Sequence, residues 1–147
     1  MDWRKYILPT LLVANVCVWT AVYAREEGKL EVYFLDVGQG DAIFFETPNK
    51  HQVLVDGGKN RQVVTMLGEL MPFGDKSIDV VIATHPDADH IGGLPEVVER
   101  YEVELFLEPG VDAEKTLNEE LHARLAEKNI QTLMARRGMI INFGDGV

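Results

Sequence analysis

The sequence predicts an α/β fold, and two observations carry this prediction. The apolar run from Val80 to Ala83 is typical of a buried strand, and it continues into a polar loop that ends in two glycines. Beyond these glycines, apolar residues recur at helical spacing: Leu94, Val97, Val98 and Tyr101. A strand, a loop and a helix therefore follow one another here, and further strands and helical stripes lie on both sides.

Three short strands are expected upstream of this unit. Residues 30–36 alternate in polarity and are rich in β-forming side chains, and glycines in the next few positions allow a tight turn. The chain returns over residues 41–46, turns at residues 47–50 and forms a third strand over residues 52–55. These strands predict a β-meander.

Helices and strands continue to alternate after the meander. Asn60 suits a helix N-cap, and the apolar stripe that follows it predicts a helix. A further strand is expected over residues 103–107, and an amphipathic helix over residues 113–128. The last expected element is a β-hairpin with strands over residues 130–134 and 139–143.

The N-terminal segment is expected to be separate from the folded body. Residues 6–24 carry no charge, and Arg4 and Lys5 precede them. A helix of this length approaches the ~30 Å hydrocarbon core of a bilayer, and the positive flank would keep its start in the cytoplasm. Residues 1–28 are therefore expected to be a transmembrane anchor or a cleaved signal peptide. Residues 29–147 would then form a domain that is extracytoplasmic or secreted.

The charge balance restricts the partners of this chain. It has 14 basic and 24 acidic residues, which gives a formal net charge of −10. Such a surface excludes a stable basic patch for nucleic acids, although a metal centre can still attract a phosphate through its own positive charge. Cys17 is the single cysteine, so no internal disulfide is possible.

The polar loop offers four potential metal ligands: His85, Asp87, Asp89 and His90. In an extended or loosely turned loop alternate side chains point the same way, so the first three can converge while His90 turns toward a second ion. Imidazole and carboxylate together suit Zn or Mn better than Ca or Mg, and we expect two divalent ions. The alternative is a solvated surface loop in which Asp87 or Asp89 caps the following helix.

Three motifs resemble one known family. Residues 85–90 (His-Pro-Asp-Ala-Asp-His) resemble the His-x-His-x-Asp-His signature of the metallo-β-lactamase fold, with aspartate in place of the second histidine. Residues 34–42 (Phe-Leu-Asp-Val-Gly-Gln-Gly-Asp-Ala) and 54–58 (Leu-Val-Asp-Gly-Gly) resemble the opening of the extracytoplasmic domain of the competence protein ComEC and its stand-alone relatives. The resemblance implies a four-layer αββα sandwich. This chain would supply the N-terminal half, preceded by one hydrophobic helix.

Three aspartates outside the loop are expected to support it. The resemblance places Asp56 beneath the loop, where it would hydrogen-bond to the loop without binding the metal. Asp36 and Asp41 lie at strand ends, where both an Asx turn and support of the metal loop remain open. We expect His51 to be a solvated turn residue and His122 to be a boundary residue of a helix.

The family's later metal ligands have no convincing match after His90, so the chain is expected to be part of a longer hydrolase. By resemblance, a metal-activated hydroxide would be the nucleophile, and Asp89 would orient it. The implied substrate is a phosphodiester, such as DNA taken up outside the cytoplasm in competence. The alternative is a truncated, non-catalytic module, anchored to a membrane, that binds a metal or a partner.

Overall fold

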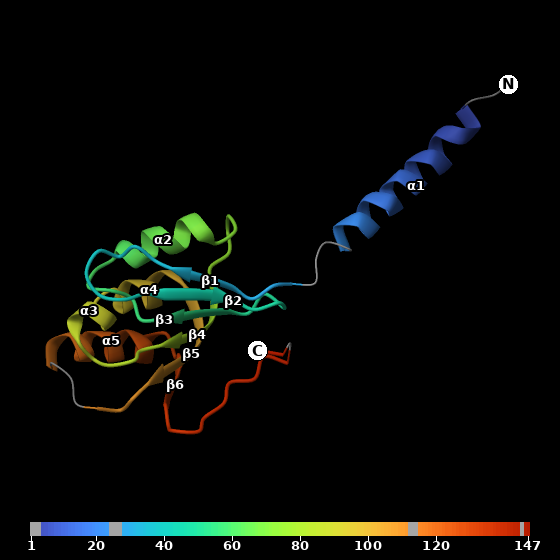
Figure 1. Ribbon diagram of the computed structural model, residues 1–147. Helices are drawn as coiled ribbons and strands as arrows, with labels where there is room; N and C mark the ends of the chain where they lie inside the picture. The colour runs from blue at the N-terminus through green and yellow to red at the C-terminus, as the bar shows by residue number, and fades with distance from the viewer. Residues whose placement is uncertain (1–3, 24–27, 112–114, 145) are drawn as a thin grey trace.

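The computed structural model describes residues 4–23, 28–111, 115–144 and 146–147, and it shows a mixed α/β fold (Figure 1). Its sheet contains six strands in chain order. The elements are α1 (Arg4–Tyr23), β1 (Glu31–Phe34), β2 (Ile43–Glu46), β3 (Gln52–Val55), α2 (Gln62–Leu70), β4 (Ser77–Ile82), α3 (Ala88–Ile91), α4 (Leu94–Arg100), β5 (Glu102–Glu108), α5 (Lys115–Glu127) and β6 (Gln131–Met134). The α/β fold class expected from the sequence is confirmed.

The sheet is antiparallel at one edge and parallel elsewhere. Strands β1, β2 and β3 pair antiparallel, as the predicted meander requires. Strands β3 to β6 then pair parallel through helical crossovers. Val55 of β3 lies opposite Ile82 of β4, so the carboxyl ends of these two strands reach the same edge of the sheet.

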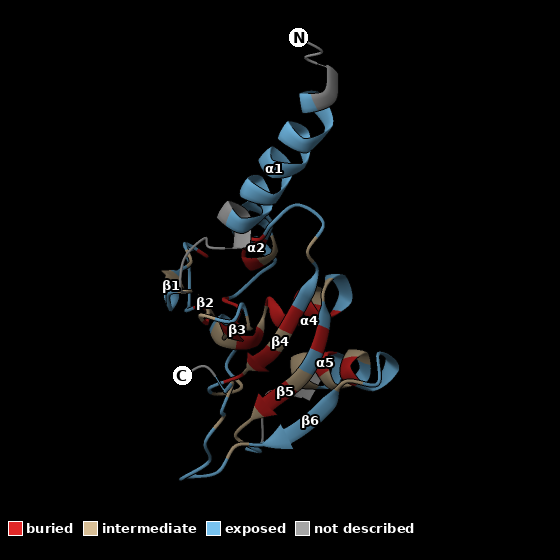
Figure 2. Cartoon of the chain, turned by 90° about the vertical axis from the view of Figure 1, so that its right-hand side faces the viewer, coloured by how far each residue is buried: buried red, intermediate tan, exposed pale blue. Residues whose placement is uncertain are grey.

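The main core lies between the sheet and helices α2, α4 and α5. Leu54, Val81 and Phe106 of the central strands are fully buried there. They pack with the apolar faces of the helices, which contribute Leu67, Leu94, Val97 and Leu121. Figure 2 shows this burial concentrated on the inner strands and on α4. Burial of each such side chain stabilises the fold by roughly 1.5–3 kcal/mol, so this face carries most of the packing energy.

The opposite face of the sheet has a smaller apolar cluster. Val53, Val80 and Leu107 are buried on it, and Ile141 and Phe143 of the C-terminal segment pack against them. The hairpin predicted over residues 130–143 is therefore wrong: residues 131–134 pair parallel with β5, and residues 139–143 form no strand. The apolar side chains of the second segment pack on the sheet face and do not extend its edge.

Helix α1 forms where the apolar N-terminal run predicts a helix. Over the residues that the structure describes, no helix combines the length and the apolar character that crossing a bilayer requires. The membrane anchor or signal peptide expected for residues 1–28 stays a prediction.

Candidate metal centre

The candidate metal centre lies at the carboxyl ends of β3 and β4. Asp56 directly follows β3, and Thr84 and His85 follow β4. The backbone N–H of Asp56 donates to the Ile82 carbonyl at 2.8 Å, which ties the two strand ends together. In open parallel sheets this edge is the usual place for a ligand, because the connecting loops meet there.

Asp56 is held rigidly at this edge. It is 3% exposed, and its φ of 58° is in the left-handed region, which aspartate tolerates better than most residues. Its Oδ1 accepts a hydrogen bond from the Thr84 N–H at 2.8 Å. Its Oδ2 accepts from the Thr84 hydroxyl at 2.6 Å and lies 2.9 Å from His90 Nδ1. The carboxylate thus lies beneath the loop and is bonded to it at three points.

A short helix sets the direction of the last two loop side chains. The alternation expected for an extended or loosely turned loop ends at residue 88, because residues 88–91 form α3 and the Asp87 carbonyl accepts from the N–H groups of His90 and Ile91. Adjacent side chains on a helix diverge by about 100°. His90 therefore faces Asp56, whereas Asp89 is exposed to solvent.

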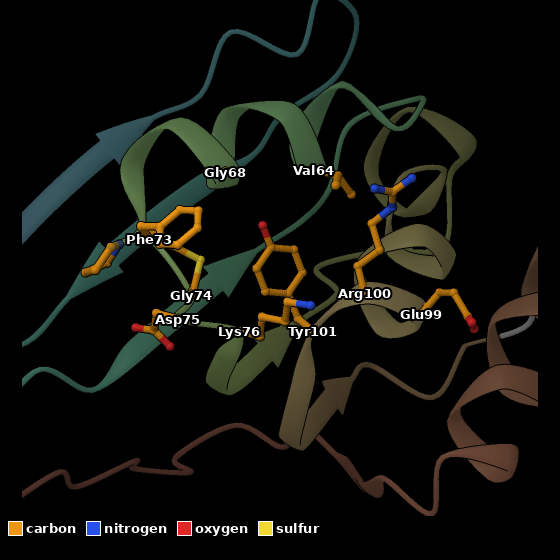
Figure 3. A pocket seen from close by; sticks show the side chains of 11 residues that line it. Val64, Gly68, Phe73, Gly74, Asp75, Lys76, Glu99, Arg100 and Tyr101 are labelled. Carbon is orange, nitrogen blue, oxygen red and sulfur yellow. The ribbon is translucent and has the colours of Figure 1, made fainter.

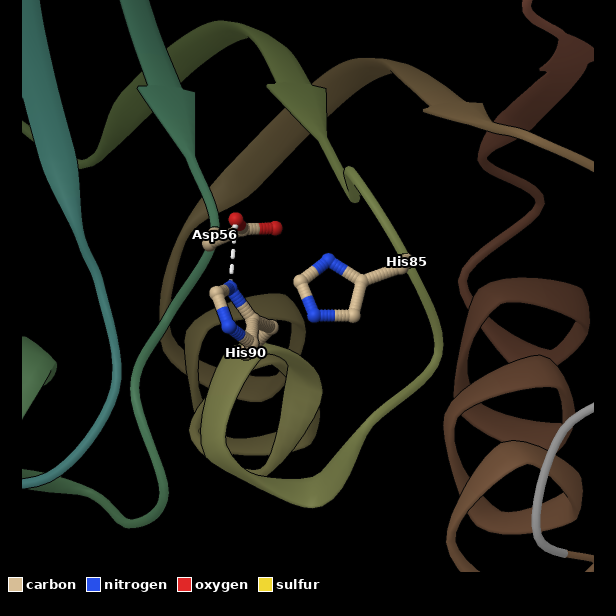
Figure 4. A group of neighbouring side chains, drawn as sticks. All are labelled: Asp56, His85 and His90. Atoms are coloured by element: carbon tan, nitrogen blue, oxygen red, sulfur yellow. Dashed lines mark hydrogen bonds and ion pairs between the residues drawn. The ribbon is translucent and has the colours of Figure 1, made fainter.

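Two imidazoles, those of His85 and His90, lie next to the buried Asp56 carboxylate (Figure 4). The ring centroids of His85 and His90 are 3.7 Å apart. His85 Nδ1 lies 2.9 Å from the Thr84 hydroxyl, and His85 Nε2 lies 3.7 Å from Asp87 Oδ2. Ligand atoms of Asp56, His85 and His90 all lie within 4.8 Å of one another. Nitrogen donors beside carboxylates are the donor set that Zn or Mn accepts, so these residues fit a divalent ion.

Of the four ligands expected from the sequence, the structure brings His85 and His90 together. Asp87 and Asp89 lie outside the cluster that the described residues form, although Asp87 Oδ2 lies 3.7 Å from His85 Nε2. The ligand roles of all four residues stay predictions. Asp56 was expected only as a supporting residue, and its three hydrogen bonds to the loop are what that role requires.

Glycines let the loops approach each other closely. A Cβ on Gly93 would overlap the Gly57 carbonyl, and a Cβ on Gly40 would overlap the Asp89 carbonyl. The Gly57 N–H donates to the His90 carbonyl at 2.7 Å. Residues 38–41 and the loop after β3 therefore pack directly against α3 and fix its position.

Asp36, Asp41 and His122 lie outside the group formed by Asp56, His85 and His90. Asp36 Oδ1 accepts from the Gly38 N–H at 3.4 Å in an Asx turn, and Asp41 is exposed, with its carbonyl accepting from Gly58. His122 Nε2 lies 3.1 Å from Glu108 Oε2. Whether Asp36 and Asp41 support the metal loop stays a prediction.

Thr84 is the functional residue that sequence reasoning missed. Its hydroxyl contacts Asp56 and His85, and its N–H donates to Asp56. The available signal was its position, directly between a buried strand and the first histidine of the loop.

A small hollow of about 10 Å³ lies on the side of His85 that faces Glu108 and Leu121, and neither Asp56 nor His90 lines it. A larger hollow of about 450 Å³ lies at the opposite end of the sheet, where Phe73, Lys76, Arg100 and Tyr101 line it (Figure 3). Burial raises the pKa of the Tyr101 hydroxyl there. That hollow is separate from the metal centre, since it lies before β4 and β5 and not after them.

Comparisons with known proteins point to one family. Residues 35–145 match the family model for the metallo-beta-lactamase superfamily. ComE operon protein 3 of Bacillus subtilis (strain 168) is 29% identical over 141 residues, and the match covers 84% of this chain and 18% of that protein. The chain thus spans less than a fifth of this relative's length.

Two solved structures also match parts of this chain. Rm3 metallo-beta-lactamase matches with a TM-score of 0.51 and 20% identity, over 77% of this chain and 45% of its own. At this identity the likeness shows the fold alone, and it supports half of a metallo-beta-lactamase sandwich. A diphosphatase from the PhnP family matches with a TM-score of 0.45 and 20% identity, over 72% of this chain and 41% of its own.

Proposed function

The chain belongs to the metallo-beta-lactamase superfamily, and from this premise we propose that it contributes the metal-binding loop of a metal-dependent phosphodiesterase. One observation carries the proposal. The imidazoles of His85 and His90 converge where β3 and β4 end, next to the buried carboxylate of Asp56, and possible ligand atoms of the three residues lie within 4.8 Å of one another. Two imidazoles, one of them held by a buried carboxylate, are typical of a hydrolytic metal centre.

We assign the ligands to two pairs, His85 with Asp87 and Asp89 with His90, and the second pair would require the exposed Asp89 side chain to turn toward His90. The distance of 3.7 Å between His85 Nε2 and Asp87 Oδ2 supports the first pair. Two donors of one zinc ion lie roughly 3–3.5 Å apart, so a small movement would suffice. Zn and Mn are the proposed ions, and the fold implies a divalent metal.

A bound divalent metal would lower the pKa of a water molecule and stabilise negative charge on the attacked phosphorus centre. The chain's own residues have two further tasks. Asp56 holds His90 through Nδ1, which leaves Nε2 as the donor atom. Asp89, exposed beside the loop, would accept a hydrogen bond from the attacking water and orient it.

The resemblance to the ComEC domain supports a phosphodiester substrate. The motifs at residues 34–42 and 54–58 resemble the ComEC domain, and ComE operon protein 3 is 29% identical. The acidic body repels polyanions, so the metal charge would have to attract the phosphate locally. We further propose that the reaction takes place outside the cytoplasm, with DNA as one candidate substrate.

The test uses the full chain with added Mn or Zn, incubated with DNA and with bis(p-nitrophenyl) phosphate. We expect cleavage of both, and a loss of at least ~100-fold in the His85→Ala variant, because metal-centre residues contribute on this scale. His51→Ala, a histidine at the other end of the sheet, is the matched control and should keep the activity. If the wild-type chain leaves both substrates intact, the proposal is wrong.

The second candidate is a non-catalytic module that binds a metal or a partner. Among the described residues only Asp56, His85 and His90 gather as a group of possible donors, and this favours the module, because a centre with two ions needs more ligands. Metal content after dialysis separates the two functions. Close to two ions per chain supports the enzyme, whereas one ion or none together with unchanged substrates supports the binding module.

A further inference from the structure

We propose that Thr84 is a positioning residue. Asp56 contacts His90 directly, and the Thr84 hydroxyl links the same carboxylate to His85. The inference rests on the proposed function only in calling the two histidines metal ligands. One buried carboxylate would then set the orientation and the protonated nitrogen of both imidazoles.

The Thr84 hydroxyl has a single hydrogen, and this allows only one assignment of donor and acceptor in its two contacts. An ionised carboxylate only accepts hydrogen bonds, so the contact of 2.6 Å between Thr84 Oγ1 and Asp56 Oδ2 uses the hydroxyl hydrogen. A hydroxyl has one hydrogen to donate. Toward His85 Nδ1, at 2.9 Å, the Thr84 oxygen must therefore accept. His85 consequently carries its hydrogen on Nδ1.

The same logic applies to His90. Its Nδ1 lies 2.9 Å from Asp56 Oδ2, and the carboxylate can only accept there as well. Both neutral imidazoles thus carry hydrogen on Nδ1 and present the lone pair of Nε2. Metal-binding histidines usually have this arrangement: one ring nitrogen donates its hydrogen to a fixed acceptor, and the other nitrogen binds the ion.

The backbone makes Thr84 a fixed intermediary. Its N–H donates to Asp56 Oδ1 at 2.8 Å, so the same residue binds both carboxylate oxygens. Asp56 is 3% exposed and is itself anchored through its N–H to Ile82. A Thr84→Val substitution keeps the shape and the backbone bond and removes only the hydroxyl.

The first test reads the imidazole tautomers directly in the metal-free full chain. Long-range ¹H–¹⁵N NMR, at a pH where both imidazoles are neutral, should show hydrogen on Nδ1 of His85 and of His90. In Thr84→Val, His85 should lose this preference and His90 should keep it. A wild-type His85 with its hydrogen on Nε2 would overturn the inference, and this reading needs no variant to fold.

The second test measures the affinity for Zn²⁺ alone by titration. Removing such a supporting partner typically weakens metal binding 10–100-fold, and we expect a loss of about this size in Thr84→Val. Thr84→Ser keeps a hydroxyl and should bind close to wild type, and the exposed Thr65→Val on α2 is the matched control. Equal affinity of Thr84→Val and the wild type would contradict the positioning role.

These readouts separate the inference from the proposed function. Intact phosphodiesters together with the expected tautomers would refute the hydrolase and leave the role of Thr84 standing. Cleavage together with an unchanged His85 tautomer in Thr84→Val would do the reverse.

Discussion

A histidine–aspartate pair lies at each end of the paired strands β3 and β4, and only one pair belongs to the candidate metal centre. At the carboxyl end, His90 Nδ1 lies 2.9 Å from Asp56 Oδ2. At the amino end, His51 Nδ1 lies 2.8 Å from Asp79 Oδ1. The pairs are nearly equal in length, so their distances alone do not explain the difference.

The two histidine–aspartate pairs differ in the residues around them and in their exposure to solvent. At the carboxyl end a second imidazole, His85, lies against His90, and the pair is largely buried, with side chains 13% and 4% exposed. At the amino end His51 stacks on Phe143 of the C-terminal segment, and its pair is 39% and 27% exposed. A histidine–aspartate pair becomes a candidate metal site where a second donor of the right type joins it.

The largest expected effect is that of Asp56→Ala. It leaves the Thr84 N–H and hydroxyl and the His90 Nδ1 without their acceptor and places alanine at a positive φ, so the free energy of unfolding should fall by at least ~3 kcal/mol. Asp79→Ala at the amino end removes bonds from partly exposed groups and should cost ~1–2 kcal/mol. Urea unfolding of both variants measures the two losses, and equal losses would remove the contrast.

Added metal should stabilise the folded chain by binding at the carboxyl end of β3 and β4, and not at their amino end. Saturation with Zn²⁺ at about 100 times its Kd should raise the free energy of unfolding by ~2.7 kcal/mol, because the ion binds the folded chain. His90→Ala should abolish this gain and His51→Ala should keep it. Thermal unfolding with and without Zn²⁺ shows the difference; a gain that depends on His51 would assign the metal to the wrong end.

Phe143→Ala sharpens the contrast at the amino end. It removes the ring that stacks on His51 with centroids 5.1 Å apart, and it removes apolar contact from the second face of the sheet. We expect a loss of ~1–2 kcal/mol in stability, since this side chain is only partly buried. The affinity for Zn²⁺ should not change, and calorimetric titration of the variant checks this.

The smallest effect concerns Asp75, beside the amino end. Its pKa lies below the ordinary value, first through the hydrogen bond from the Ser77 N–H, and also through the Ser77 hydroxyl and Gln52. A lowered folded-state pKa means that the contribution is present above the unfolded value of about 3.9 and is lost as the pH falls through the folded value. Asp75→Asn should therefore flatten the acid side of the stability curve, which unfolding at several pH values measures.

Much of the fold could be predicted because its signals are local. The meander, the apolar strand before residue 84 and the helices around it follow from alternation, helical periodicity and turn glycines. The hairpin at residues 130–143 failed because β6 finds its partner in β5, far away in the sequence, and because Ile141 and Phe143 pack on a sheet face. Periodicity reports how a segment alternates and cannot report which strand it joins.

The candidate site was predictable to a similar degree. Residue types and spacing picked out His85, Asp87, Asp89 and His90, and the resemblance added Asp56. Two features could not be predicted from the sequence. One is the start of a helix at residue 88, which turns Asp89 outward, and the other is the pair of contacts that Thr84 makes with Asp56 and His85. The pairing of His51 with Asp79 was also missed, since these residues are brought together only by the register of β3 and β4.

The sequence by itself determined the donor chemistry, the α/β alternation and the family, because side-chain types and local periodicity are written in neighbouring residues. The tertiary structure decided which donors meet. It sets Asp56 beneath two imidazoles and joins His85 to it through Thr84, because the parallel register of β3 and β4 brings together strand ends that lie 28 residues apart in the chain.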